Sequence, residues 1–447
     1  MVEIHTVGGF SEVGRNMTCL DLGEDAIILD AGLFLPAIVE MEEAEREMSE
    51  RKLRSVGALP DDLILDRLGI RNKVRAILAS HAHLDHTGAI PYIGQRYNAE
   101  VLATPFTVEV LKSLYRDENV PMKNNIKVVQ PNSIYAVQGK KNKIEVEFIN
   151  VTHSTLQSTL MAVHTKEGVI LYANDFKFDN NPILGKMPNY QRLKELAKEG
   201  VLALVVESLY AADERKTPSE KIARGLLEDV LLTTSNENGC VIVTTFSSHI
   251  ARLKSIVDFG KQLKRKIIFL GRSLNKYVSA ANRVKLVPFM KDIQLISYRK
   301  QMDSVLKKVA AKRKEYMLVV TGHQGEPGSI LDRMASNKLP YTFSSKDHVI
   351  FSSRTIPTPI NITQKAKLDA KLKARGVRIF SDIHVSGHAG REDLRDFINM
   401  VQPLHIIPAH GDLKKLSALG ELAQELGYRL GKDCHIMQNG SKIKLSR

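Results

Sequence analysis

The sequence predicts an α/β protein that contains a separate, doubly wound α/β domain. Short apolar runs that end in polar residues alternate with segments of helical pattern along most of the chain. The 447 residues, 43% of them hydrophobic, suit two or three domains with an ordinary buried core. Residues 208–358 hold 26 Lys and Arg against 13 Asp and Glu, so this segment carries +13 of the net charge of +14. The basic segment, with its own alternation of strands and helices, is the doubly wound domain.

Composition also excludes several classes of protein. No apolar run is long enough to cross a bilayer, and residues 1–5 predict neither a signal peptide nor a transit peptide. Cys19, Cys240 and Cys434 lie far apart, unlike a disulfide framework or a zinc ribbon, which favours the reducing cytoplasm and no membrane partner. A pI near 9.4 indicates a polyanionic partner.

The chain is organised around the loop at residues 80–88. An apolar run at 74–79 predicts a buried strand that ends at Ser80. Four side chains of metal-ligand type follow within six positions, namely His81, His83, Asp85 and His86. Imidazole nitrogens and carboxylate oxygens suit zinc, and four such groups so close together cannot all bind one ion comfortably. The loop therefore predicts two adjacent metal ions rather than a surface loop that happens to be rich in histidine.

The strand expected at 26–29 delivers Asp30 to its end. A carboxylate in this position could orient a ligand histidine, or it could cap the turn, and the local sequence leaves both interpretations open. The segment at 39–55, acidic first and then basic, predicts an exposed helix with no assigned chemistry.

Polar side chains also end the apolar runs further along the chain. The runs at 144–151, 168–173, 201–206 and 405–409 are followed by His153, Asp175, Glu207 and His410, in that order. One histidine at a strand end is usually structural. The repetition of the pattern downstream of the histidine loop predicts instead that these side chains join the metal site.

The basic segment presents loops that suit a nucleic-acid backbone. Strands expected at 240–245, 266–270 and 317–320 are followed by loops that contain Ser247 and His249, Arg272 and Ser273, and residues 321–325. Gly and Ser at strand ends let backbone N–H groups approach phosphates. Each loop alone is a weak signal, but their coincidence with the basic domain predicts nucleic-acid contacts.

A second phosphate-directed segment precedes a helix expected from Arg391. It contains His384, Ser386, Gly387 and His388. Backbone donors and the positive end of the helix dipole suit a phosphate there. His388 does not stand at the bare end of a strand, so an anion contact is predicted for it rather than a metal bond. The alternative is a histidine that merely caps the helix.

Taken in order, these motifs resemble the metallo-β-lactamase superfamily. Its four motifs match Asp30, the 81–86 loop, His153 and Asp175, and the three extra motifs of its nucleic-acid-processing β-CASP branch match Glu207, His388 and His410. The local sequences at 207–208, 217–220, 271–273, 324–327 and 384–389 are similar to the ribonuclease J family in its archaeal type. The resemblance implies an αββα sandwich formed by residues 1–207 and 359–447, with a β-CASP domain inserted at 208–358.

The resemblance also implies a role for each motif. Two zinc ions would be held, one by His81, His83 and His153, the other by Asp85, His86 and His410, with Asp175 as a bridge between them. His83 favours zinc over iron, because iron-binding relatives often carry Glu at that position. A hydroxide shared by the two ions would attack the phosphorus. His388 would contact the scissile phosphate or assist the leaving group, and Glu207 would orient His388.

The implied activity is 5′-to-3′ exonucleolytic decay of single-stranded RNA, with some internal cleavage. A pocket that includes Ser386 and Gly387 would receive a 5′-monophosphate. Three alternatives remain: a β-CASP endonuclease of the mRNA 3′-end processing type, a small-ester or thioester hydrolase, and a non-catalytic RNA-binding subunit. An ester hydrolase would not need the basic domain, and a non-catalytic subunit would have lost ligands that are all present here. The resemblance admits a homodimer and RNA-decay partner proteins.

Overall fold

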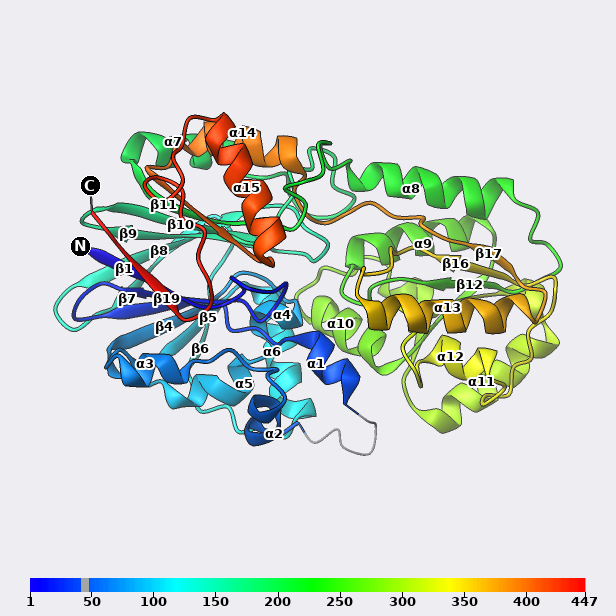
Figure 1. Ribbon diagram of the computed structural model, residues 1–447. Helices are drawn as coiled ribbons and strands as arrows, with labels where there is room; N and C mark the ends of the chain where they lie inside the picture. The colour runs from blue at the N-terminus through cyan, green and yellow to red at the C-terminus, as the bar shows by residue number, and fades with distance from the viewer. Residues whose placement is uncertain (42–47, 447) are drawn as a thin grey trace. The chain divides into compact units, whose positions relative to one another are not determined.

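The structure is a computed structural model that describes residues 1–41 and 48–446 (Figure 1). The chain forms two compact units. Unit 1 comprises Met1–Asn180, Gly185–Thr217 and Gly387–Arg447, and unit 2 comprises Asn181–Leu184 and Pro218–Ser386. No helix in the described part of the chain is both long and apolar enough to span a bilayer.

Unit 1 is built on two sheets. The seven-stranded sheet has the order β19 (Ser441–Leu445), β1 (Val2–Gly8), β2 (Met17–Asp21), β3 (Ala26–Leu29), β4 (Val74–Ala79), β5 (Glu100–Ala103) and β6 (Ile126–Val128). The six-stranded sheet has the order β18 (His405–Ala409), β11 (Val201–Glu207), β10 (Gly168–Ala173), β9 (Thr159–Thr165), β8 (Lys143–Asn150) and β7 (Ser133–Gln138). The strands nearest the two ends of the chain, β1 and β19, pair antiparallel and are neighbours in the same sheet.

The two sheets pack face to face. Ile4 and Leu20 from one sheet join Val146 and Met161 from the other in a single buried apolar cluster. A second cluster lies on the opposite face of the six-stranded sheet, where α7 (Tyr190–Glu199), α14 (Arg391–Val401) and α15 (Leu413–Glu425) cover it (Figure 1). The seven-stranded sheet is flanked by α3 (Leu63–Arg67), α5 (Ile90–Ile93) and α6 (Pro105–Asp117) (Figure 1). Helix, sheet, sheet and helix are therefore layered as the αββα prediction requires.

The strands that carry the predicted ligands all run in the same direction within their sheets. β3 and β4 are parallel neighbours, as are β10, β11 and β18. β8 is antiparallel to β9, which is antiparallel to β10, so β8 also runs parallel to β10. Parallel strands end at one edge of a sheet, so the polar side chains that follow these strands gather at that edge.

Unit 2 is a doubly wound domain. Its six strands have the order β14 (Ile293–Ile296), β13 (Lys266–Leu270), β15 (Tyr316–Val320), β12 (Val241–Thr244), β16 (His348–Phe351) and β17 (Arg378–Phe380), and every neighbouring pair is parallel. Apolar residues of α11 (Arg299–Ala311), α12 (Ile330–Ala335) and α13 (Pro359–Lys373) form a cluster with one face of the sheet. α9 (Ile250–Gln262) packs against the sheet's other face, where Gly260 lies close to Ile267 and Met317. The unit is completed by α8 (Glu220–Glu228) and α10 (Arg272–Arg283).

The boundary between the units differs from the expected 208–358. α13 and β17, at residues 359–380, belong to unit 2, because β17 pairs with β16 and α13 buries Leu368 and Leu372 in the unit 2 core. With these boundaries unit 2 holds 30 Lys and Arg and 13 Asp and Glu, a net +17, whereas the rest of the chain holds 34 and 37, a net −3. The net positive charge of the protein thus lies in unit 2.

The single helix expected at 39–55 is not observed in the described residues. α1 (Leu35–Glu40) ends at the extended Met41, and α2 (Glu50–Ser55) begins anew with the side chain of Ser49 capping its N-terminus. Residues 42–47 lie outside the described part of the chain. A further short helix, α4 (Leu84–Thr87), begins inside the histidine loop itself.

Candidate metal centre

Every side chain predicted to bind metal reaches one place in unit 1. His81 and His83 lie in the loop after β4, and Asp85 and His86 lie on α4, for which His83 is the N-cap. His153, Asp175 and His410 follow β8, β10 and β18. Each residue offers one ligand atom to one of two groups: His81, His83, His153 and Asp175, or Asp85, His86, Asp175 and His410, with all ligand atoms of a group within 4.8 Å of one another. Asp175 belongs to both groups, as the predicted bridge should.

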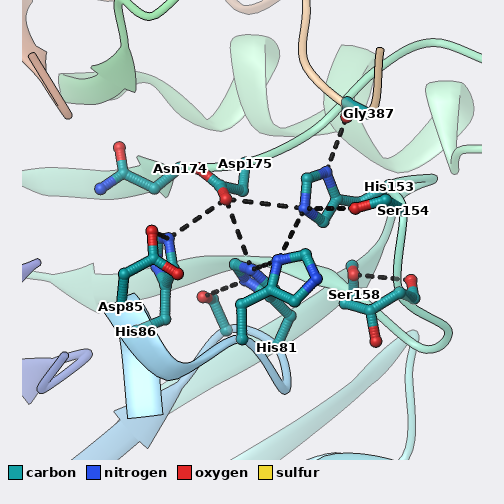
Figure 2. Close-up of polar contacts among 12 residues, drawn as sticks. His81, Asp85, His86, His153, Ser154, Ser158, Asn174, Asp175 and Gly387 are labelled. Atoms are coloured by element: carbon teal, nitrogen blue, oxygen red, sulfur yellow. Dashed lines mark hydrogen bonds and ion pairs between the residues drawn. The ribbon is translucent and has the colours of Figure 1, made fainter. Parts of the chain in front are cut away.

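Asp175 lies at the middle of the cluster (Figure 2). Its Oδ2 is 3.2 Å from His86 Nε2 and 3.5 Å from the Nε2 atoms of both His81 and His153. Its Oδ1 is 3.6 Å from His410 Nε2, is buried, and makes no hydrogen bond to any described residue. A buried carboxylate oxygen without a hydrogen bond is costly, so this atom indicates a ligand position.

Four of the ligand histidines make a hydrogen bond through Nδ1 on the side away from the cluster, whereas Nδ1 of His83 faces His81 and His153. His86 Nδ1 donates to Asp30 Oδ2 at 2.8 Å, and His153 Nδ1 donates to the Gly387 carbonyl at 2.6 Å. His81 Nδ1 is 3.0 Å from the hydroxyl of Ser80, which itself donates to Asp30 Oδ2. Asp30 therefore orients two ligands, which supports the metal-orienting interpretation of this residue over a simple turn cap.

The fourth ring, His410, is held by a residue that the sequence did not single out. His410 Nδ1 donates to Asn16 Oδ1 at 2.8 Å, and Asn16 Nδ2 donates to the Asp85 carbonyl at 3.0 Å. Asn16 is buried and lies in a Gly-rich turn between β1 and β2. Because its partner is 394 positions away, no local pattern could have revealed this contact. Asn16 joins the two chain segments that supply Asp85 and His410.

Backbone conformation also aims the ligands. Asp30, Asp175 and His410, each within two residues of a strand end, have φ of 58°, 58° and 57°. A residue other than glycine in this left-handed region costs on the order of 1 kcal/mol, and it persists only where its surroundings enforce it. Backbone bonds enforce it here: Asp30 N donates to Leu78 O at 2.8 Å, and His410 N donates to Gly9 O at 2.7 Å. Local strain at these strand ends points to a functional constraint.

Burial and the central carboxylates set the charges of the site. Burial lowers the pKa of His81, and it lowers the pKa of His410 to about 4, so both rings are neutral at pH 7. Burial would also lower the pKa of His86, but the carboxylates of Asp175, Asp85 and Asp30 raise it well above its usual value. The pKa of Asp175 lies well below its usual range, because the surrounding histidines outweigh its burial. The carboxylates thus attract positive charge to the centre.

The residues present fit a pair of divalent cations. With Nδ1 engaged as a donor, the Nε2 atoms of His81, His153 and His410 are the lone-pair ends that meet at Asp175, and His86 Nε2 would present its own lone pair where a cation displaces its proton. Converging lone pairs and carboxylates in a buried place repel one another unless cations lie between them. Imidazole and carboxylate ligands with outer hydrogen bonds are the usual donor set of a zinc site. The donor chemistry of these residues therefore matches the metal binding expected from the sequence.

Glu207 and His388 form a separate pair next to this cluster. His388 Nδ1 is 2.8 Å from Glu207 Oε2 and 3.7 Å from Asp175 Oδ1. Burial would lower the pKa of His388, but Asp175 and Glu207 raise it to about 9. The backbone of His388 is fixed as well, because Thr217 Oγ1 donates to the His388 carbonyl at 2.6 Å. These two residues also form a third ligand-like group with Asp175, but their direct hydrogen bond is typical of an ion pair.

The predicted RNA-binding residues of unit 2 divide into exposed and buried ones. Arg272 is exposed, and Ser247 Oγ lies 2.9 Å from Ser273 Oγ, so these two loops meet. His249 is only 3% exposed, and its side chain caps α9 and pairs with Glu220 at 3.4 Å. His384 Nδ1 lies 3.4 Å from Arg252. RNA contacts of these residues, and of Ser386 and Gly387 beyond them, stay predictions.

Comparison with known proteins identifies the parts of the chain. Residues 11–196 match the family model described as metallo-beta-lactamase superfamily, residues 238–366 match the ribonuclease J beta-CASP domain, and residues 375–437 match the Zn-dependent metallo-hydrolase RNA specificity domain. A crystal structure of a protein of unknown function from Enterococcus faecalis V583 shares the fold, with a TM-score of 0.66 at 17% identity over 99% of each chain.

Whole-chain relatives carry the comparison further. The chain is 41% identical to Ribonuclease J of Methanocaldococcus jannaschii, over 100% of this chain and 99% of that protein. It is 43% identical to Ribonuclease J of Pyrococcus abyssi, over 100% of this chain and 97% of that protein. Identity at this level across the full length, with the metal-ligand cluster complete, means that the chain belongs to the ribonuclease J family of β-CASP metallo-β-lactamase proteins.

Proposed function

We propose that this protein is a zinc-dependent ribonuclease that degrades single-stranded RNA from a 5′-monophosphate end in the 5′-to-3′ direction, with some internal cleavage. Membership of the ribonuclease J family supports a metal-dependent ribonuclease. The observation that carries the proposal is the convergence of six ligand side chains on Asp175, with the ligand atoms of each group within 4.8 Å of one another.

Two ions would be held by the two ligand groups that share Asp175. His81, His83 and His153 would hold one ion, and Asp85, His86 and His410 would hold the other. Bound there, the metals supply a hydroxide nucleophile at neutral pH and offset negative charge on the phosphate. The chain's own contribution is to fix the ligand directions through Asp30, Ser80, Asn16 and the Gly387 carbonyl.

His388 would act on the substrate rather than on the metals. Glu207 holds Nδ1, so the opposite ring nitrogen, Nε2, is the one that would donate to a phosphate oxygen or to the leaving group. Glu207 is fully buried and also accepts from Phe176 N at 2.8 Å, which fixes the carboxylate itself. Glu207 is therefore a positioning residue for His388.

The 5′-end preference rests on the segment that carries Ser386 and Gly387. The Gly387 carbonyl accepts from the ligand His153, so this segment is tied directly to the metal centre. A Cβ at Gly387 would lie 2.9 Å from the Ser154 side chain and 3.0 Å from His153, so only glycine fits there without a shift. A terminal phosphate received by this segment would lie next to the reacting centre. The segment would then fix how far from the 5′ end the chain is cleaved.

One digestion experiment tests the proposal. A single RNA is labelled at each end in turn and carries a 5′-monophosphate, triphosphate or hydroxyl. We expect mononucleotides from the 5′-monophosphate form and slower decay of the triphosphate, whose added phosphates must fit beyond a site sized for one. Internal products that are indifferent to the 5′ end would favour the 3′-end-processing type of endonuclease. Binding without any cleavage, with both metals present, would favour the non-catalytic subunit.

The wider setting of the protein is also proposed. The RNA substrate and the ribonuclease relatives support work in the cytoplasm. A homodimer and RNA-decay partner proteins stay predictions, which size measurement in solution and pull-down with RNase-treated extract would check.

A further inference from the structure

One aromatic side chain of unit 2 is exposed where other aromatics are covered. Tyr298, between β14 and α11, is 74% exposed. Every other Phe or Tyr in the described part of the chain is buried or half-buried. A ring of this size contributes to stability when it is buried, so a largely exposed ring in an ordered turn between a strand and a helix is better explained by a ligand than by folding.

The surroundings of this ring are positively charged. Arg299 and Lys300 follow it directly and are exposed, and Asp303 is the sole acidic residue of α11. The whole of unit 2 carries a net +17. A surface of this kind attracts an anionic partner and disfavours a basic one.

Tyr298 also continues a row of polar loops along one edge of the sheet. Gly271 N donates to Ile296 O at 3.1 Å, which places the loop with Arg272 and Ser273 beside the end of β14. Ser273 in turn touches Ser247 in the loop after β12. All these strands are parallel, so their loops share the carboxyl edge, and the row from β12 to β14 spans about 14 Å at the usual strand spacing.

We propose that Tyr298 is a stacking platform for a base of single-stranded RNA, with Arg299 and Lys300 contacting the neighbouring phosphates. The row would then present hydroxyl groups, a guanidinium and an aromatic face in succession, which is the combination that binds single strands without sequence preference. This subsite rests on the RNA substrate proposed above and extends it to the outer edge strand of unit 2.

Binding of a labelled, single-stranded RNA, followed by fluorescence anisotropy, tests the subsite. Tyr298→Ala should weaken the affinity by about 5- to 100-fold, the usual worth of one base–aromatic stack. Tyr298→Phe should keep the affinity, because stacking needs the ring and not the hydroxyl. The affinity for duplex RNA, whose bases are already stacked on one another, should change little on Tyr298→Ala. Ile362→Ala is the matched control, since Ile362 is also exposed (54%) and lies on α13 of the same unit.

The two cations have a control of their own. Arg299→Ala with Lys300→Ala should reduce the salt slope of binding by about 1.4, for two phosphates on a single strand. Lys314→Ala with Lys346→Ala removes the same charge from exposed positions before β15 and β16, at the opposite edge of the sheet, and should leave RNA affinity nearly unchanged. An effect of equal size in both pairs would show that only net charge matters and would overturn the subsite.

Crosslinking locates the contact directly. RNA with 5-iodouridine, irradiated on the wild-type protein, should add mass to the tryptic peptide 292–299, in which Tyr298 is the sole aromatic residue. Wild-type cleavage and binding with a Tyr298→Ala variant equal to wild type would refute the subsite and leave the ribonuclease proposal intact. A wild-type protein that neither binds nor cleaves RNA would refute both. Loss of an acidic protein partner with unchanged RNA affinity would assign the surface to that protein instead.

Discussion

The metal centre of unit 1 and the strand-end loops of unit 2 occupy the same kind of place in a sheet but are built in opposite ways. Five of the seven ligand side chains, including Asp175, are buried, four ligand histidines are hydrogen-bonded through their outer nitrogen, and three backbone positions are left-handed. Arg272 and Tyr298 at the edge of unit 2 are exposed, in the unit that carries the net +17. The contrast teaches that chemistry requires fixed, dehydrated groups, whereas binding a flexible polyanion requires accessible charge.

The largest expected effect comes from Asp175, the carboxylate that both ligand groups share. Asp175→Asn keeps the size of the side chain but removes the charge shared by both ligand groups. We expect loss of both metals, measured by elemental analysis of the purified variant, and cleavage at the level of buffer. RNA binding should persist, because the cations of unit 2 are untouched. Full activity of the wild-type protein after exhaustive chelation would contradict the metal-dependent assignment.

A smaller loss should follow from removing a group that acts on the substrate. His388→Ala should keep both metals and near-normal RNA binding while cleavage falls by roughly 10²–10⁴, the usual worth of a positioned acid or base. His410→Ala is the comparison, because its ring faces Asp175 and it should lose metal together with activity. If metal analysis finds the His388 variant depleted and the His410 variant replete, the two roles are exchanged.

Unit 2 has a buried charge cluster around Arg252, and it should matter for stability rather than for chemistry. Arg252 is fully buried and donates to Glu220 Oε2 at 2.8 Å, and His249 lies on the same carboxylate. Glu220→Gln leaves Arg252 without its counter-charge, which should lower the free energy of unfolding by about 3–5 kcal/mol. Glu228→Gln, an exposed change on the same helix, should stay within about 0.5 kcal/mol.

The same cluster gives unit 2 a pH dependence of known sign. Burial would raise the pKa of Glu220, but His249 and Arg252 hold it well below its usual value. A lowered folded-state pKa stabilises the fold above the unfolded pKa of about 4.3, and this contribution is lost as the pH falls through the folded value. Acid unfolding followed by circular dichroism should therefore begin at a higher pH in a Glu220→Gln variant, and a profile identical to wild type would contradict the role of this pair.

The sequence revealed the metal centre well because its signals are local. His81, His153, Asp175 and His410 stand within two residues of the end of an apolar run, and the doubly wound domain follows from the alternation of such runs with helical segments. The αββα sandwich was implied by the resemblance to the metallo-β-lactamase superfamily. The hydrogen bonds that orient the ligand histidines could not be predicted from the sequence, since Asn16 meets His410 only after the whole of unit 1 has folded. The domain boundary at 358 missed α13 and β17, although the positive bias that marked the insertion continues through residues 359–380, which hold six Lys and Arg against one Asp.

Asn16 tests how far the outer contacts control the centre. Asn16→Ala removes the acceptor of His410 Nδ1 and the donor to the Asp85 carbonyl, so metal affinity of the Asp85, His86 and His410 group should fall by about 10- to 100-fold. Asn16→Asp restores the acceptor and should recover most of the affinity. Titration of the metal-free protein, with the two binding steps resolved, makes the measurement. An equal loss at both steps would indicate general unfolding rather than positioning of one group.

The smallest expected effect belongs to the exposed charges of unit 2. Arg272→Glu with Lys276→Glu should flatten the salt dependence of RNA binding, since each phosphate that is no longer neutralised reduces the slope by roughly 0.7 on a single strand. The change should weaken binding to all sequences alike and raise KM, while kcat at saturating RNA and the metal content stay at wild-type values, because no ligand of the metal centre is altered. Single-turnover cleavage across a salt series separates the two parameters. A fall in kcat at saturation would mean that these loops help to set the reacting geometry, and the contrast between a binding unit and a chemical unit would then fail.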